Sequence, residues 1–144
     1  MHEKSNIPVF VSVVLVLLGC YDLIRGFMHT FLLNYSALNI AGLNLTTLQA
    51  SDLLRLLGAF GVSNFLTGIM FMMIACTSRK LSLAMLGIIP SVYFIGYLTI
   101  HASTKLYPHT QALWLGLTPL LVYMCVCLAT FMLGLGVVVY RRNA

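Results

Sequence analysis

The sequence predicts an all-α membrane protein, an integral four-helix bundle in which every helix crosses the bilayer. Of 144 residues, 60% are hydrophobic and only 8% charged, whereas soluble domains are about 25% charged. Most of the chain falls into four apolar runs, each reaching the ~20 residues that a spanning helix needs: 7–33, 53–76, 81–100 and 112–140. These runs lack the alternation of a β-barrel. We therefore expect one four-span domain, residues 1–144.

Basic residues predict the orientation of this domain. Three groups of them fall on one side of the predicted topology: Lys4, Arg79 with Lys80, and Arg141 with Arg142. The positive-inside rule makes that side cytoplasmic, so both termini are expected inside and the loops 34–51 and 101–111 outside. The net charge of +5 is spread over ends and turns without a basic stripe, which excludes a nucleic-acid partner.

The first run begins near the N-terminus, where a targeting signal is the alternative to a span. Leu17 to Cys20 fits the loose pattern of a bacterial lipoprotein signal, in which Cys20 would be acylated. The apolar stretch continues beyond this cysteine, and no small-residue cleavage site follows it. We favour a spanning helix, and lipidation of Cys20 stays an open alternative.

The second run carries a helix-start signal and a packing stripe. Thr46 and Gln49 form a capping-box pattern, which predicts a helix beginning near Thr47 and a loop along the headgroups before it. Within the run, Gly61, Asn64 and Gly68 share one helix face. Small residues let membrane helices approach closely, so we expect this stripe to be an ordinary helix contact.

The third and fourth runs each contain a proline. Gly87 and Ser91 form a small-xxx-small pair that predicts another helix contact. Pro90 lies near the middle of the third run and Pro119 in the outer half of the fourth. Proline removes a backbone hydrogen bond and bends a helix. Two bent neighbours could enclose a cavity, although simple packing of bent helices is the more common outcome.

Beyond residue 3 the chain has only two carboxylates, and each precedes an arginine by three residues. The pairs are Asp22 with Arg25 and Asp52 with Arg55. Asp22 lies about 15 residues into the first run, roughly 22 Å along a helix. A charged group inside a span costs free energy and is a functional candidate with its partner, whereas Asp22 and Arg25 could also form a purely structural pair.

The predicted topology gathers the polar candidates at the outer membrane face. The expected ligand-binding residues are Asp22, Arg25, His29, Asp52, Arg55 and His101, with Lys105 and His109 nearby. All but the first three are better explained as interfacial side chains with their heads in water. His29 and His101 could ligate a haem iron from two sides, a reading that we rank below interfacial placement. No metal-binding or catalytic motif is present, so nothing in the sequence requires an enzyme.

The chain resembles the DoxX-like superfamily of small bacterial membrane proteins. The similar stretches are Arg25-Gly26-Phe27-Met28-His29 and Leu54-Arg55-Leu56-Leu57-Gly58, within a shared four-helix plan. The resemblance implies a bundle in the bacterial inner membrane that binds small apolar or quinone-like molecules or accompanies membrane redox proteins. The aspartate that precedes each arginine is not part of what the resemblance explains.

Three functions are consistent with this sequence. The first is an outward-facing polar pocket for a small quinone- or lipid-like ligand, or for docking a membrane redox partner, with Arg25, Arg55 and His29 holding the polar group. The second is a dimeric proton- or ion-coupled transporter in which Asp22 titrates. The third is a purely structural accessory subunit, bound to a partner protein or to its own copies.

Overall fold

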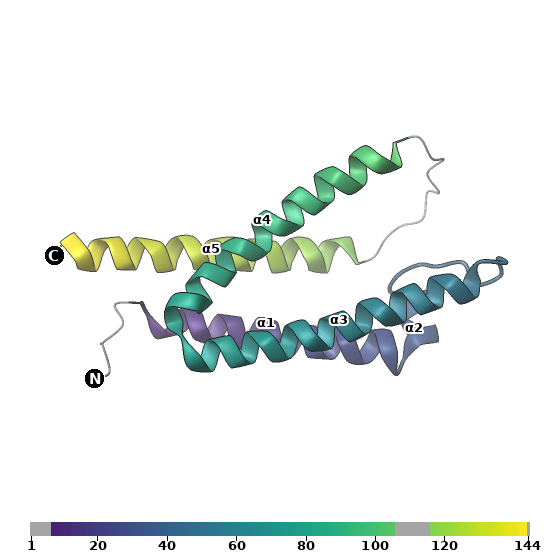
Figure 1. Ribbon diagram of the computed structural model, residues 1–144, viewed down its shortest axis with the longest axis horizontal. Coiled ribbons are helices and arrows are strands. Elements are labelled where there is room, and N and C mark those ends of the chain that lie inside the picture. The colour runs from purple at the N-terminus through teal and green to yellow at the C-terminus, as the bar shows by residue number, and fades with distance from the viewer. Residues whose placement is uncertain (1–6, 106–115, 144) are drawn as a thin grey trace.

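The protein is all-helical in the part of the chain described by the computed structural model, residues 7–105 and 116–143. Its elements are α1 (Val9–Thr30), α2 (Leu33–Asn39), α3 (Ala50–Thr77), α4 (Arg79–Thr104) and α5 (Leu117–Asn143) (Figure 1). Four of these, all except α2, are long and apolar enough to cross a membrane. The prediction of four long apolar helices is thereby confirmed, while the side on which the termini lie stays a prediction.

Two ends of the bundle are useful landmarks. The α2 end holds α2, the end of α1, the start of α3 and the end of α4, and the turn end holds the α3–α4 turn (Figure 1). At the turn end Ser78 caps α4, because its side chain accepts a 3.3 Å hydrogen bond from the backbone N–H of Leu81. This short turn makes α3 and α4 sequential neighbours that run in opposite directions.

Glycines bring α1 and α3 into close contact. A Cβ at Gly68 would lie 2.7 Å from the carbonyl oxygen of Gly19, and one at Gly61 would lie 2.9 Å from the Cβ of His29. Only glycine allows the backbones to approach this closely. The predicted contact role of the Gly61 and Gly68 stripe is confirmed, and its partner is α1.

The apolar core lies toward the turn end, where all four long helices meet. Its fully buried members are Val11, Leu15, Leu86 and Cys127. Gly87 serves the predicted contact, since a Cβ there would meet the Phe131 ring at 2.9 Å. Beyond the core α4 diverges from α1 and α3 toward the α2 end (Figure 1). As a result nearly every residue of 91–105 is exposed.

The structure differs from the predicted elements in the segment between the first two spans. The expected loop contains α2, whose Ser36 and Ala37 are buried against the bundle. Docking onto α1 and α3 stabilises a helix that is too short to be predicted from its own pattern.

The start of α3 also differs from the prediction, because the helix begins at Ala50 rather than near Thr47. Thr46 does not cap the helix. Its backbone N–H and hydroxyl both donate to the Asn44 side chain, at 2.9 and 2.7 Å, in a local turn. Of the predicted fourth span, residues 112–115 lie outside the described residues.

Candidate functional site

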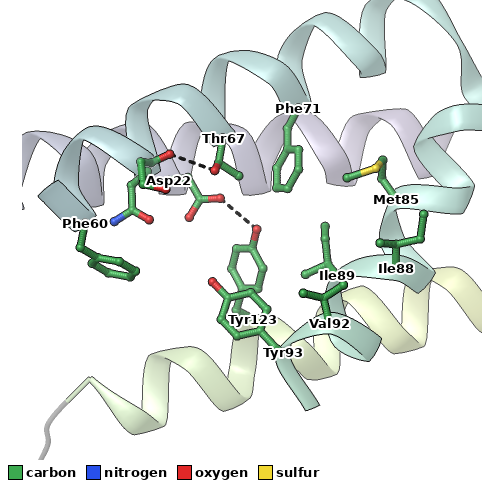
Figure 2. Close-up of a pocket in the computed structure, with 12 residues that line it drawn as sticks. Asp22, Phe60, Thr67, Phe71, Met85, Ile88, Ile89, Val92, Tyr93 and Tyr123 are labelled. Carbon is green, nitrogen blue, oxygen red and sulfur yellow. Dashed lines mark hydrogen bonds between the residues drawn. The ribbon is translucent and has the colours of Figure 1, made fainter. Parts of the chain in front are cut away.

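Asp22 is the buried charge of the bundle. Its side chain accepts a 3.0 Å hydrogen bond from the Tyr123 hydroxyl on α5, and its other carboxylate oxygen lies 3.6 Å from an Arg25 nitrogen (Figure 2). The residue is only 4% exposed. A buried charge needs both a counter-ion and hydrogen bonds, and here Arg25 and Tyr123 supply them. The predicted Asp22–Arg25 pair is therefore formed, and Tyr123 completes it.

Arg25 is held by aromatic rings as well as by its carboxylate. The guanidinium carbon lies 5.6 Å from the Tyr21 ring centroid and 5.3 Å from that of Phe60. Such cation–π contacts compensate part of the hydration that a cation loses at this depth. They also fix Arg25 between α1 and α3, next to a residue that lines the pocket described below.

A pocket of about 290 Å³ lies between α1, α3, α4 and α5, and Asp22 forms part of its wall (Figure 2). Most of the lining is apolar or aromatic, and the polar groups come from α1, α3 and the two tyrosines. The lining residues are Asp22, Phe60, Ser63, Asn64, Thr67, Phe71, Met85, Ile88, Ile89, Val92, Tyr93 and Tyr123. The Ile88, Ile89 and Val92 side chains flank Pro90 in α4. The cavity therefore lies beside one of the two prolines whose bends were expected to allow a cavity.

The buried and exposed lining residues separate into a floor and a rim. Asp22, Asn64 and Tyr123 are buried and form the polar floor, whereas Ile88 is 49% and Val92 60% exposed. Val92 lies about 18–20 Å from either end of α4, and half of a hydrocarbon core is only about 15 Å thick. For a helix that crosses the bilayer, the rim therefore lies at the depth of the bilayer interior, and the exposed lining residues of α3 and α4 place the opening between these two helices. The sequence predicted an outward-facing pocket instead.

Asn64 brings an unsatisfied donor to this floor. The residue is 6% exposed, and its amide nitrogen has no hydrogen-bond partner among the described residues. The neighbouring Thr67 hydroxyl, by contrast, donates 2.9 Å to the Ser63 carbonyl of its own helix (Figure 2). Leaving a buried N–H unpaired costs about 1–3 kcal/mol, so Asn64 stands out from the other polar lining residues.

His29 has a different environment from Asp22 and Arg25. It is buried, and its Nδ1 shares a hydrogen bond with the Ser36 hydroxyl of α2. Its ring centroid lies 5.8 Å from that of Phe60. His29 therefore links the end of α1 to α2 through this hydrogen bond. It does not line the pocket.

The other three predicted site residues are exposed. Asp52 lies in the first turn of α3, where a negative charge interacts favourably with the positive end of the helix dipole. Arg55 follows one turn later, and His101 stacks on Tyr97 with ring centroids 5.9 Å apart. None of the three lines the pocket. Lys105 is exposed as well, and His109 lies outside the described residues.

Two functional candidates were not predicted as site residues. Tyr123 gave no signal, because one tyrosine in an apolar run is unremarkable and its partner is 101 positions away. The sequence pattern indicates for Asn64 only a place in the packing stripe with Gly61 and Gly68. An amide in the middle of a span is a signal that could have marked it, since such a group needs a partner in hydrocarbon. In the described ranges no cluster of three or more His, Cys, Asp or Glu could hold a metal ion.

Comparison of the chain with protein-family models, curated proteins and solved structures gives no match. The fold and the site themselves define the class, a small helical membrane protein with an internal, mainly apolar pocket. The DoxX-like resemblance stays a prediction that rests on the two short stretches described above.

Proposed function

We propose that this protein binds a small amphipathic molecule, quinone- or lipid-like, in the pocket between α1, α3, α4 and α5. The observation that carries the proposal is a polar floor of buried Asp22, Asn64 and Tyr123 beneath apolar walls. Ligand pockets typically combine such walls with a few polar groups and measure roughly 300–1,000 Å³. A pocket of about 290 Å³ accommodates one ring or a short length of chain rather than a whole lipid.

The roles of the polar residues follow from their contacts. Asp22 holds Tyr123 and Arg25 in place through its hydrogen bond and ion pair. The cation–π contact then places Arg25 beside Phe60, at the pocket wall. When the polar group of a ligand contacts the polar floor, its apolar part packs against the apolar α4 side chains that line the pocket. No step of this binding needs catalysis.

Native mass spectrometry in a mild detergent tests the proposal, with Val92→Trp as the blocking variant. Val92 lines the rim and is 60% exposed, so a larger side chain there narrows the pocket without disturbing the core. Ile95→Trp is the matched control, because Ile95 is 62% exposed on the same helix and does not line the pocket. We expect a discrete bound mass on the wild type and the control that is lost from Val92→Trp. Equal retention by both variants contradicts the proposal.

Proton- or ion-coupled transport is the second candidate function. It is favoured by one observation, that a buried carboxylate both lines the pocket and is hydrogen-bonded to another helix. The Arg25 ion pair opposes it, because a nearby cation favours the charged form of the carboxyl group over the neutral form that proton uptake produces. Asp22→Asn in proteoliposomes separates the two functions. Loss of substrate-driven proton flux with ligand binding retained supports transport, and absence of any flux in the wild type excludes it.

Localisation and orientation belong to the same proposal. Four helices long and apolar enough to cross a membrane make the protein an integral membrane protein, and we place it in a bacterial inner membrane with both termini in the cytoplasm. Cysteines introduced at Tyr35 and Arg142, in a variant without native cysteines, test the orientation in intact cells. A membrane-impermeant maleimide is expected to label Tyr35→Cys and not Arg142→Cys, and the reverse pattern inverts the topology.

A further inference from the structure

The amide of Asn64 is the one side-chain donor that the described bundle buries without satisfying. It lies at the middle of α3, about 20 Å from either end of the helix, and it lines the pocket. Membrane interiors offer no water to such a group, so it must pair inside the protein or with a ligand. We infer that Asn64 is a ligand-binding residue whose Nδ2 donates a hydrogen bond to the carbonyl oxygen of a neutral compound dissolved in the bilayer. This inference rests on the proposed function and names its ligand class.

The charges around the pocket select a neutral acceptor. Asp22 lines the same pocket, so an anionic ligand would enter beside a buried carboxylate. The nearest cation, Arg25, is already paired with that carboxylate at 3.6 Å and would repel a cationic ligand. An ion of either sign would also lose its hydration in a medium of low dielectric constant, so the pocket favours a neutral ligand. A carbonyl oxygen accepts the Asn64 hydrogen bond without adding a charge.

The position of the rim determines the route by which the ligand arrives. The exposed lining residues Ile88 and Val92 belong to the middle of α4. Beyond them, α4 diverges from α1 and α3 toward the α2 end (Figure 1). A molecule diffusing in the hydrocarbon layer therefore reaches the pocket sideways, between α3 and α4. Only its carbonyl-bearing part is enclosed, since a volume of about 290 Å³ is smaller than a whole lipid.

A matched pair of probes tests the carbonyl on the wild-type protein. The probes are 2-undecanone and undecane, compared by thermal unfolding in detergent at equal mole fraction in the micelle. One hydrogen bond to an otherwise unpaired donor corresponds to about tenfold tighter binding of the ketone. Infrared spectra of ketone labelled with ¹³C at the carbonyl should show that band at lower frequency when the ketone is bound. Equal binding of ketone and alkane, as expected if a trapped water satisfies Asn64, overturns the inference.

Asn64→Leu is the decisive variant, because it keeps the number and branching of the side-chain heavy atoms and removes the amide. It should abolish the preference for ketone over undecane and the infrared shift. It should also raise the unfolding temperature of the ligand-free protein, since an unpaired buried donor has been removed. A purely structural Asn64 gives the opposite result, with lower stability and an unchanged ketone preference. Thr99→Val is the control, because Thr99 is exposed and does not line the pocket, and it should leave the ketone preference unchanged.

Two further probes identify the source of the carbonyl. Decylubiquinone represents a ring carbonyl and dioleoylglycerol an ester carbonyl, and stronger stabilisation by one of them names the ligand class. The outcomes separate a failure of the pocket as a ligand site from a failure of Asn64 as its hydrogen-bond donor. If none of the four probes binds, the proposed function fails together with this inference. If ketone and alkane bind the wild type equally well and neither binds the Val92→Trp variant, the pocket is a ligand site and only the role of Asn64 is wrong.

Discussion

The Tyr123 hydroxyl on α5 donates a 3.0 Å hydrogen bond to the Asp22 carboxylate on α1, across 101 positions of sequence. Both residues are buried and both line the pocket. This bond joins the first and the last helix of the bundle, and Tyr123 is at the same time a member of the apolar core. The floor of the pocket is thus also a structural link between α1 and α5.

Tyr123→Phe should destabilise the protein by about 1–3 kcal/mol. The variant keeps the ring in place and leaves one oxygen of the buried Asp22 without its donor. Thermal or denaturant unfolding in detergent measures the effect. Tyr140→Phe, at a tyrosine that is 75% exposed, is the control and should leave stability unchanged. Identical stability of both variants would mean that the Tyr123 hydroxyl contributes nothing to the bundle.

Arg25→Met should cost more than the double variant Asp22→Asn/Arg25→Met. The single change leaves a buried carboxylate without its cation, for which losses of about 3 kcal/mol or more are typical. The double change removes both charges, so part of the loss is recovered. The free energy of unfolding in detergent is measured for the single variant, the double variant and the wild type. Arg55→Met, at an exposed arginine, should shift stability by no more than about 0.5 kcal/mol, and a similar loss there would contradict a special role for the buried pair.

Gly68→Ala should separate α1 from α3. Its new Cβ would lie 2.7 Å from the Gly19 carbonyl oxygen, a contact that the backbone can relieve only by moving. Overpacking of this kind costs about 1–3 kcal/mol. Gly96→Ala is the matched control, because nothing lies within 4 Å of a Cβ at that position. There the better helix propensity of alanine should stabilise the helix slightly. Circular dichroism melts of the two variants should therefore move in opposite directions.

Ser36→Ala should release α2 without unfolding the bundle. The substitution removes the hydroxyl that shares a hydrogen bond with His29, the side-chain link between α2 and α1. Hydrogen–deuterium exchange should become faster in α2 and stay unchanged at the centres of α1 and α3, since local opening costs less than global unfolding. Ser91→Ala serves as control because its hydroxyl bonds within its own helix. Unchanged exchange in α2 would show that its buried backbone contacts hold it without the histidine.

Much of the architecture was predictable because a spanning helix satisfies its own backbone and displays an apolar surface. Such helices are recognised from composition and length alone. The Gly61 and Gly68 contacts followed from residue size. The helix α2 did not, because seven residues have no stability of their own and depend on the buried Ser36 and Ala37. The start of α3 was misplaced because Asn44 competes for Thr46.

The candidate site divides in the same way. Asp22 and Arg25 were predicted as a pair because i and i+3 positions meet on any helix, and the structure forms that pair. Asp52, Arg55 and His101 are exposed, which agrees with the alternative that they are interfacial side chains rather than ligand-binding residues. The pocket could not be predicted, since its lining comes from α1, α3, α4 and α5 and depends on where α4 turns away from its neighbours.

By itself the sequence determined the class of the protein, the number of long apolar helices and the Asp22–Arg25 ion pair. These properties depend on composition and on contacts within a single helix. The tertiary structure alone decided that Tyr123 meets Asp22, that Asn64 keeps an unpaired amide and that Asn64 and Tyr123 line one pocket. The physical reason is that packing between helices in lipid is set by shape and by a few buried polar groups, rather than by a hydrophobic pattern that can be read along the chain.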